Sequence, residues 1–477
     1  MARRRRKAPP DEEPSKPRPV QPLGERDIVV LFADVVGCSE ISNHKEIKDY
    51  NDFINSFQQC FKSVCGHYKQ AEYEENERPF FQAEARGDEG CLKIFVPNRD
   101  DLSRDIDVAI NIALDLKRKW LLEKENKGRI DNGLLPVDVG IGIHSGKVWV
   151  NKEKDERGND KYRPEGYAIN LTKRIESESR GGKFTHILVS ESARGQLYNL
   201  KDECTYRFDT PFTINPRGIS RDIKVFEIKH HFLPTDWTEE PTEVSMVYRE
   251  LEPTRAKLEI SKKAYDINPM NLWIAEEYVL LSVMQAYKKL DKEKKVGDVA
   301  ALRKAYWPAL GATRQITNSN LRDAGLLALL GFVLGEQKNY SEEQQMYVEG
   351  LEMDEQDALL HWYLGYSISC EIDDKQQKQK NVKIAVFYNE TQEKIEKILK
   401  AFERALELMP MNAWIVYDFA CELSWWSQVH ERRFRSQAIG ELIRAFALNP
   451  ETKKRAKEEK YLKPIIDDPK VKKYLEG

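Results

Sequence analysis

The chain has 477 residues, enough for roughly two to four domains of average size. Hydrophobic residues make up 40% and charged residues 32%, a balance that excludes collagen-like, low-complexity and fully disordered chains. The formal net charge is -3, so no overall positive field attracts nucleic acid, and we expect no nucleic-acid partner.

The cysteines and the apolar runs restrict where the protein works. The 7 cysteines include no CxxC pair, so neither a disulfide framework nor a zinc site is predicted. The longest apolar run, 324–335, is much shorter than the roughly 20 residues that cross a bilayer. The N-terminus has no apolar signal region. We therefore expect a cytoplasmic protein without a membrane span.

The first elements can be predicted in chain order. Residues 1–24 begin with arginines and become proline-rich, which predicts a disordered tail. A β-branched strand is predicted at 27–36, and the turn Gly87-Asp88-Glu89-Gly90 between strands 80–86 and 91–96 predicts a hairpin. Between them, apolar residues at three- and four-residue steps predict a helix. They are Ile47, Tyr50, Phe53, Ile54, Phe57, Cys60, Phe61 and Val64.

The later elements complete a β-α-β-β-α-β order. This order predicts a ferredoxin-like α+β domain over 25–232, followed by a proline-containing linker at 233–243. The expected elements are helices at about 101–126 and 168–179 and strands near 137–144, 186–190, 205–214 and 223–229.

Residues 244–477 have helical periodicity and no strand signal, which predicts a separate all-α domain. Anchors with one spacing recur there as Phe402-Ala405-Pro410 and Leu442-Ala445-Pro450, and Tyr347-Gly350-Glu355 is similar. The pattern resembles tetratricopeptide repeats, in which small residues let paired helices pack closely and a proline marks a helix end. Because the anchors are unequally spaced, we predict an irregular helical-repeat domain of unknown ligand.

Two carboxylates of the first domain carry the predicted chemistry. Asp34 ends the first strand, and the small residues Gly37 and Cys38 after it can turn their backbone N–H groups toward phosphates. Asp88 lies at the hairpin tip, which is a neighbour of the first strand in this order. Taken alone, each aspartate is more often a turn or cap residue. Together they offer the oxygen ligands that Mg²⁺ requires.

These residues belong to an ordered set of blocks that resembles the catalytic domain of class III nucleotide cyclases over about 27–230. The blocks are 31–39, Gly87-Asp88, 139–146, 165–177, 187–190, and Pro216-Arg217-Gly218 before 225–227. The resemblance implies that Asp34, Asp88 and the carbonyl of Val35 hold two divalent cations, Mg²⁺ or Mn²⁺. It implies that a nucleoside triphosphate is cyclised by in-line attack of its 3′ hydroxyl on the α-phosphorus, which expels pyrophosphate.

The resemblance also assigns roles on the predicted helix at 168–179. Asn170 would orient the ribose, Arg174 would meet the α-phosphate, and Arg217 would contact the triphosphate tail. In this family the aspartates face the asparagine and arginine across an interface, which implies a head-to-tail homodimer with two composite sites. Outside this motif, Asn170 and Arg174, four residues apart, would be read as a surface hydrogen bond.

The chain departs from the family pattern at Gly140, where an arginine is common. The phosphate contact of that arginine is then absent, or it is supplied by Lys147 or Arg163. The neighbouring His144 is interpreted as a structural histidine rather than a base.

Two positions that read the nucleobase in the family hold Glu84 and Arg163. A carboxylate and a guanidinium suit the guanine edge and, equally, the uracil edge; the alternative is an ordinary ion pair at the interface. Tyr50 either fills the space of a purine or is a core aromatic residue. These features resemble bacterial antiphage pyrimidine cyclases and imply UTP as substrate, cyclic UMP as second messenger and a separate effector that senses it.

Other functions stay open. The domain could be a guanylate or adenylate cyclase in ordinary signalling, or an inactive cyclase-like scaffold for the helical repeats, although the intact site residues argue against a scaffold. The same fold order also supports polymerases and diguanylate cyclases.

Overall fold

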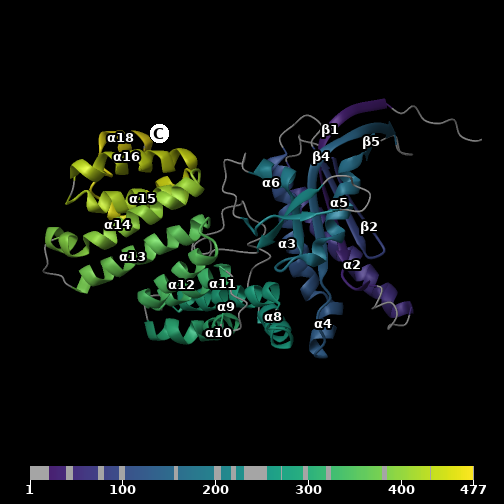
Figure 1. Ribbon diagram of the computed structural model, residues 1–477, viewed down its shortest axis with the longest axis horizontal. Coiled ribbons are helices and arrows are strands. Elements are labelled where there is room, and N and C mark those ends of the chain that lie inside the picture. Colours follow the sequence, from purple (N-terminus) through teal and green to yellow (C-terminus); the bar gives the residue numbers. More distant parts are fainter. Residues whose placement is uncertain are drawn as a thin grey trace, which may run out of the picture.

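The structure is a computed structural model that describes residues 21–38, 47–73, 80–95, 102–154, 160–197, 206–215, 222–229, 255–269, 271–293, 299–317, 324–378, 384–429 and 431–475. Figure 1 shows a sheet domain, coloured purple to teal, beside an all-helical domain, coloured green to yellow. The predicted combination of an α+β domain followed by an all-α domain is confirmed.

The sheet has the strand order β2-β3-β1-β4-β6-β9-β7, with β5 paired to β4 and β8 paired to β9. Strands β4 and β6 are parallel, and the other pairs are antiparallel. The strands are β1 (Gln21–Val35), β2 (Phe80–Arg86), β3 (Glu89–Phe95), β4 (Val139–Lys154), β5 (Asp160–Glu165), β6 (Ile187–Ser190), β7 (Arg207–Phe208), β8 (Phe212–Ile214) and β9 (Ile223–Lys229).

The central pair, β1 and β4, is longer than the sequence predicts. β1 pairs with β4 from Gln21 opposite Lys152 to Val35 opposite Val139, with an irregularity between Pro22 and Gly24. The strand therefore begins inside the segment 1–24 that we expected to be a tail. The polar start of β1 gives no apolar signal, and its pairing with the long β4 makes it a strand.

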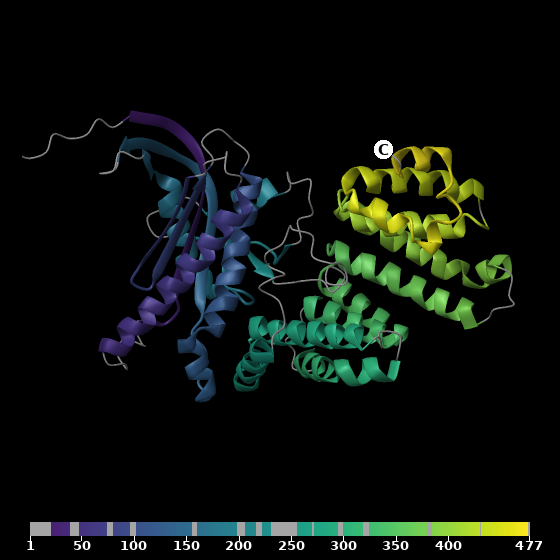
Figure 2. The same ribbon diagram turned by 180° about the vertical axis from the view of Figure 1, so that it is seen from behind.

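Two helices cover one face of the sheet, α2 (Ile47–Glu72) and α3 (Ser103–Leu122), which cross it side by side in Figure 2. Phe53 and Phe57 from α2 meet Trp120 of α3 edge-on, with ring centroids 5.3 and 5.5 Å apart. The Trp120 indole N–H donates to the carbonyl of Val137 over 2.9 Å. The helix expected at 101–126 ends at Leu122, and a second helix, α4 (Lys124–Asp131), follows it.

The opposite face is covered by α5 (Tyr167–Ser177), which lies close to β4 because glycines alternate along that strand. A Cβ on Gly142 would lie 2.8 Å from Glu176 Cα and 2.9 Å from the Thr172 carbonyl. His144, also on β4, is buried, and its Nδ1 lies 2.8 Å from Ser190 Oγ. The interpretation of His144 as a structural residue agrees with these contacts.

Helices of the second domain pack as successive antiparallel pairs in Figure 1. Pro410 and Pro450 each follow a helix end by two residues, as the repeat pattern predicts, and the anchors Phe402 and Leu442 are fully buried. Their assignment to tetratricopeptide repeats stays a prediction. The helices are α8 (Arg255–Ile267), α9 (Leu272–Lys292), α10 (Val299–Thr317), α11 (Ala324–Glu336), α12 (Tyr340–Met353), α13 (Ala358–Lys378), α14 (Ile384–Leu408), α15 (Ala413–Trp426), α16 (Glu431–Leu448), α17 (Glu451–Ala456) and α18 (Pro469–Leu475).

The two domains share a buried contact between α3 and α9. Arg118 Nε lies 3.4 Å from a carboxylate oxygen of Glu277, and both side chains are about nine-tenths or more buried. Leu121 and Ile130 of the sheet domain pack in one apolar cluster with Trp273 and other residues of α8 to α11. None of the helices in the described ranges has the length and apolar character that a bilayer crossing requires.

Candidate active site

The end of β1 and the tip of the β2–β3 hairpin meet. Asp34 is opposite Glu89 of β3 on one side and Gly140 of β4 on the other. The backbone N–H of Val35 donates to the carbonyl of Asp88 over 3.2 Å. The structure therefore brings together Asp34, Val35 and Asp88, which the sequence analysis proposed as cation ligands.

The electrostatics at Asp34 suit a cation. Burial raises the pKa of Asp34, the Lys173 ammonium opposes this rise, the Asp88 carboxylate adds to it, and the Arg180 guanidinium opposes it. A bound divalent cation would compensate this excess of partly buried negative charge.

The few protein oxygens at this site fit a Mg²⁺ ion that takes its other ligands from water and substrate. No group of three or more ligating side chains is present in the described ranges. Mg²⁺ is bound in many phosphate-handling sites by one or two carboxylates, with water and substrate phosphates completing the shell. Asp34, Asp88 and the Val35 carbonyl are a donor set of this kind, so the residues present fit the group.

The loop after Val35 has the geometry of a tight turn. Gly37 has a φ of +74°, a conformation that favours glycine. Cys38 is buried, and its Sγ lies 3.2 Å from the hydroxyl of Tyr50. Burial raises the pKa of Cys38 to about 11, although the hydrogen bond with Tyr50 opposes this rise, so this side chain stays a thiol near neutral pH.

The position of Tyr50 agrees with the reading as a core aromatic residue, and its proposed role in excluding purines stays a prediction. Its ring packs at the edge of the core under the sheet. Its hydroxyl contacts Cys38, three residues after Val35, and the hydrogen bond raises the pKa of Tyr50 to about 12. The residue is therefore both a core aromatic and a neighbour of the candidate cation site.

Asn170 and Arg174 lie one helical turn apart on α5, and both are exposed. The largest charge effects on the pKa of Asp34 come from Lys173, Asp88, Arg180 and Glu89. In the described part of the chain, no ion pair joins Arg174 to Asp34, which pairs with Arg180 instead.

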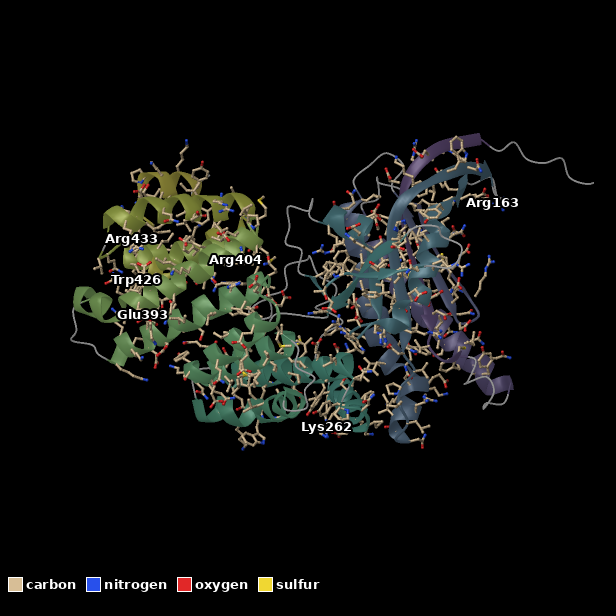
Figure 3. All side chains as sticks on the ribbon, in the orientation of Figure 1. Arg163, Lys262, Glu393, Arg404, Trp426 and Arg433 are labelled. Carbon is tan, nitrogen blue, oxygen red and sulfur yellow. The ribbon has the colours of Figure 1, made fainter. Side chains whose placement is uncertain are left out.

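The proposed base-reading pair is also separated within one chain. Glu84 of β2 accepts a hydrogen bond from Gln82 and lies 3.6 Å from an Arg86 nitrogen. Arg163 of β5 is exposed, opposite Asn151, and Figure 3 places it at the outer edge of the sheet domain. The structure does not bring Glu84 and Arg163 into contact. Arg217 lies outside the described residues.

One site residue was missed by the sequence analysis. Arg180, in the short 3₁₀ helix η1 (Ser179–Gly181), places Nη2 3.2 Å from Oδ2 of Asp34. Arg180 lies ten residues after Asn170 and belongs to no recognisable motif. Its place beside Asp34 follows from the packing of Ser179 against Gly140, which only the structure shows.

Lys147, which the sequence offered as a substitute phosphate ligand, lies elsewhere. Its ammonium is 3.3 Å from Glu25 and 3.7 Å from Asp27. It is seven residues from Gly140 along β4, which is roughly 23 Å at the rise of a strand. Lys147 therefore does not replace the missing arginine within its own chain.

The sheet domain matches the model of a known sequence family. Residues 20–230 match the sequence model of the adenylate and guanylate cyclase catalytic domain. This segment is therefore a class III nucleotide cyclase catalytic domain, as the sequence motifs predicted. No curated protein is significantly similar to the chain.

Several solved structures are similar to part of the chain. The adenylyl cyclase CyaB from P. aeruginosa is 17% identical over 45% of this chain and 97% of its own, with a TM-score of 0.36. The guanylyl cyclase Cya2 is 20% identical over 43% of this chain and 93% of its own, with a TM-score of 0.33. The guanylate cyclase domain of RhGC from Catenaria anguillulae, in complex with GTP, is 19% identical over 43% of this chain and 97% of its own, with a TM-score of 0.31.

Proposed function

We propose that the protein converts a nucleoside triphosphate, with UTP preferred, into the 3′,5′-cyclic monophosphate and pyrophosphate. The observation that carries this proposal is the meeting of Asp34 and Asp88 beside the Val35 backbone, inside a cyclase catalytic domain. The 3′ oxygen forms a bond to the α-phosphorus, the bond to the pyrophosphate oxygen breaks, and the hydroxyl proton is released.

Asp34, Asp88 and the Val35 carbonyl would hold the divalent cations. When bound, such ions lower the pKa of the attacking hydroxyl and neutralise charge on the phosphates. The exposed Asn170 would orient the ribose, and Arg174 would donate to the α-phosphate as its charge grows.

The site is completed by a second copy of the chain. Because Arg174 is exposed and Asp34 pairs with Arg180 in its own chain, we place Arg174 opposite Asp34 of the partner in a head-to-tail homodimer. Trp149 and Tyr167 are 52% and 46% exposed. Trp149 is opposite Glu165 in the β4–β5 pair, two residues from Tyr167. Exposed aromatic side chains at one edge are typical of an interface.

The base preference rests on Glu84 and Arg163. A uracil edge offers an N–H to the carboxylate and a carbonyl to the guanidinium. Since the two side chains are apart in one chain, the homodimer must bring Glu84 and Arg163 to the same base. The proposed role of the product, a cyclic UMP messenger that a separate antiphage effector senses, rests on the resemblance to pyrimidine cyclases.

The decisive experiment is incubation of the pure full-length chain with Mn²⁺ and each of the four ribonucleoside triphosphates, followed by identification of products by mass spectrometry. Cyclic UMP as main product supports the proposal. Preferred turnover of GTP or ATP would show that the preference for uracil is wrong. Linear or dinucleotide products would show that the proposed cyclisation is wrong. Nucleotide binding without any product would favour the scaffold.

Tyr50→Ala separates the two contributions of that residue. If the ring limits the depth of the base pocket, the variant gains turnover of GTP relative to UTP. If the ring is only part of the core, the variant loses thermal stability and keeps the ratio of the two rates.

A further inference from the structure

Within the described ranges, Arg180 makes an ion pair with Asp34, and the proposed function gives Arg180 no role. Its guanidinium Nη2 lies 3.2 Å from Oδ2 of Asp34. The Arg180 side chain is 53% exposed, whereas the Asp34 side chain is 19% exposed. The guanidinium therefore reaches into the site from its open side.

The backbone of Arg180 is fixed by the way η1 packs on β4. Gly140 is opposite Asp34, and a Cβ on Gly140 would overlap with Oγ of Ser179. Within η1, the N–H of Gly181 donates to Glu178 and the N–H of Gly182 donates to Ser179, both over 3.0 Å. The glycine at position 140 thus leaves the space that η1 occupies, and η1 places residue 180 beside Asp34.

The neighbouring Lys173 differs from Arg180 in its ion-pair partners. Lys173 Nζ is held by two carboxylates, at 2.5 Å from Glu89 and 3.1 Å from Glu176. A cation bound at Asp34 would leave both of these ion pairs in place. The ion-pair partner of Arg180 is Asp34 itself, so a bound cation competes with Arg180 and releases its guanidinium.

The released guanidinium of Arg180 can bind the phosphates of the nucleotide. Cations held by Asp34 also contact the phosphates of the nucleotide, so the phosphate oxygens lie within one side-chain length of Arg180. The planar guanidinium binds phosphate oxygens in pairs, more strongly than neutral hydrogen-bond donors do.

We propose that Arg180 alternates between two partners: it pairs with Asp34 in the empty site, and it binds the triphosphate once divalent cations occupy Asp34. This inference rests on the proposed function, since it assigns a residue of the same chain to the phosphates of that substrate. Arg180, on η1, would then make the phosphate contact that is missing at Gly140 on β4.

The inference predicts opposite effects of one substitution on two ligands. Arg180→Ala removes a competitor for Asp34, so Mn²⁺ alone should bind about two- to fivefold more tightly, as expected for one partly exposed ion pair. The same substitution removes a charge-assisted hydrogen bond to phosphate, so 3′-deoxy-UTP with Mn²⁺, which lacks the attacking hydroxyl, should bind about tenfold more weakly or worse.

The measurements are isothermal titrations of the full-length chain with Mn²⁺ and then with 3′-deoxy-UTP. Arg180→Lys should recover part of the nucleotide affinity because it keeps the charge. Arg255→Ala is the matched control, since Arg255 also makes one exposed ion pair, at 2.8 Å from Glu259 on α8; both affinities should be unchanged.

The opposite shifts distinguish this role from a structural one, because a misfolded site would weaken both ligands together. Unchanged affinities, or a loss of both in a variant with normal thermal unfolding, would overturn the inference. If the wild-type chain forms no cyclic product from any nucleotide, the proposed function fails, and the two titrations still decide whether Arg180 exchanges Asp34 for phosphate.

Discussion

Gly142→Ala tests how the sheet positions α5, the helix that carries the proposed site residues Asn170 and Arg174. The new Cβ would lie 2.8 Å from Glu176 Cα and 2.9 Å from the Thr172 carbonyl, and closer still to the Glu176 nitrogen. These atoms belong to the backbone of α5, so no side-chain rotation relieves the overlap. The helix must retreat from β4 by at least the difference between 2.8 Å and the 3.4 Å of ordinary contact.

This retreat affects stability and activity together. Overpacking of this kind costs about 1–3 kcal/mol, which lowers the thermal midpoint of a domain of this size by roughly 2–10 °C. Because α5 carries Asn170 and Arg174, and a displacement near 1 Å can cost about 10²-fold in rate, we expect a fall in kcat/KM of that order.

The assay compares thermal unfolding and cyclase kinetics with those of Gly66→Ala. Gly66 lies exposed within α2, and a Cβ there meets no atom within 4 Å. Alanine at this position should stabilise the helix by about 0.5–1 kcal/mol and leave kcat/KM unchanged. If Gly142→Ala unfolds and reacts like the wild-type chain, the close approach of α5 to β4 is refuted.

Other expectations concern individual carboxylates. Asp34→Ala or Asp88→Ala should abolish cyclisation at an unchanged circular dichroism spectrum, because each removes a cation ligand; near-normal turnover of either variant contradicts the cation site. Mixing the inactive Asp34→Ala and Arg174→Ala chains should restore activity, since one of the two composite sites then has both native halves; mixed dimers that are proven by mass spectrometry and stay inactive refute the homodimer. Burial opposes ionisation of Asp138, yet Lys117 at 2.5 Å helps to lower its pKa from 3.8 to about 2. A lowered pKa stabilises the fold above pH 3.8, and this stabilisation is lost as the pH falls toward 2. The difference in thermal midpoint between wild type and Asp138→Asn should therefore shrink between pH 3.8 and 2. A difference that stays constant would contradict the lowered pKa of Asp138.

Local patterns in the sequence predicted the parts of the fold that depend on neighbours in the chain. The hairpin turn at Gly87-Asp88 and the strand Phe80–Arg86 follow from turn chemistry and β-branched or aromatic residues. The prolines Pro410 and Pro450 correctly predicted two helix ends. In each case the signal and the structure it predicts lie within a few residues of each other.

The contacts that complete the site could not be predicted in this way. Arg180 reaches Asp34 across 146 positions, and its placement depends on the packing of η1 against Gly140. The exposed position of Arg163 depends on how far β4 and β5 extend together. Such contacts are set by tertiary packing, and one sequence carries no periodicity that reports them.

A series of contacts links the helical domain to the end of β1. Lys117 of α3 is almost fully buried, and its ammonium lies 2.5 Å from Asp138 and 5.7 Å from the centre of the Trp273 ring of α9. The carbonyl of Asp138 in turn accepts a hydrogen bond from the N–H of Val36, two residues after Asp34. A buried lysine must keep its carboxylate partner, because an unpaired charge in the interior costs several kcal/mol. The same ion pair, with a buried lysine and a partly buried aspartate, therefore connects the helix that packs on α9 to the loop that follows Asp34.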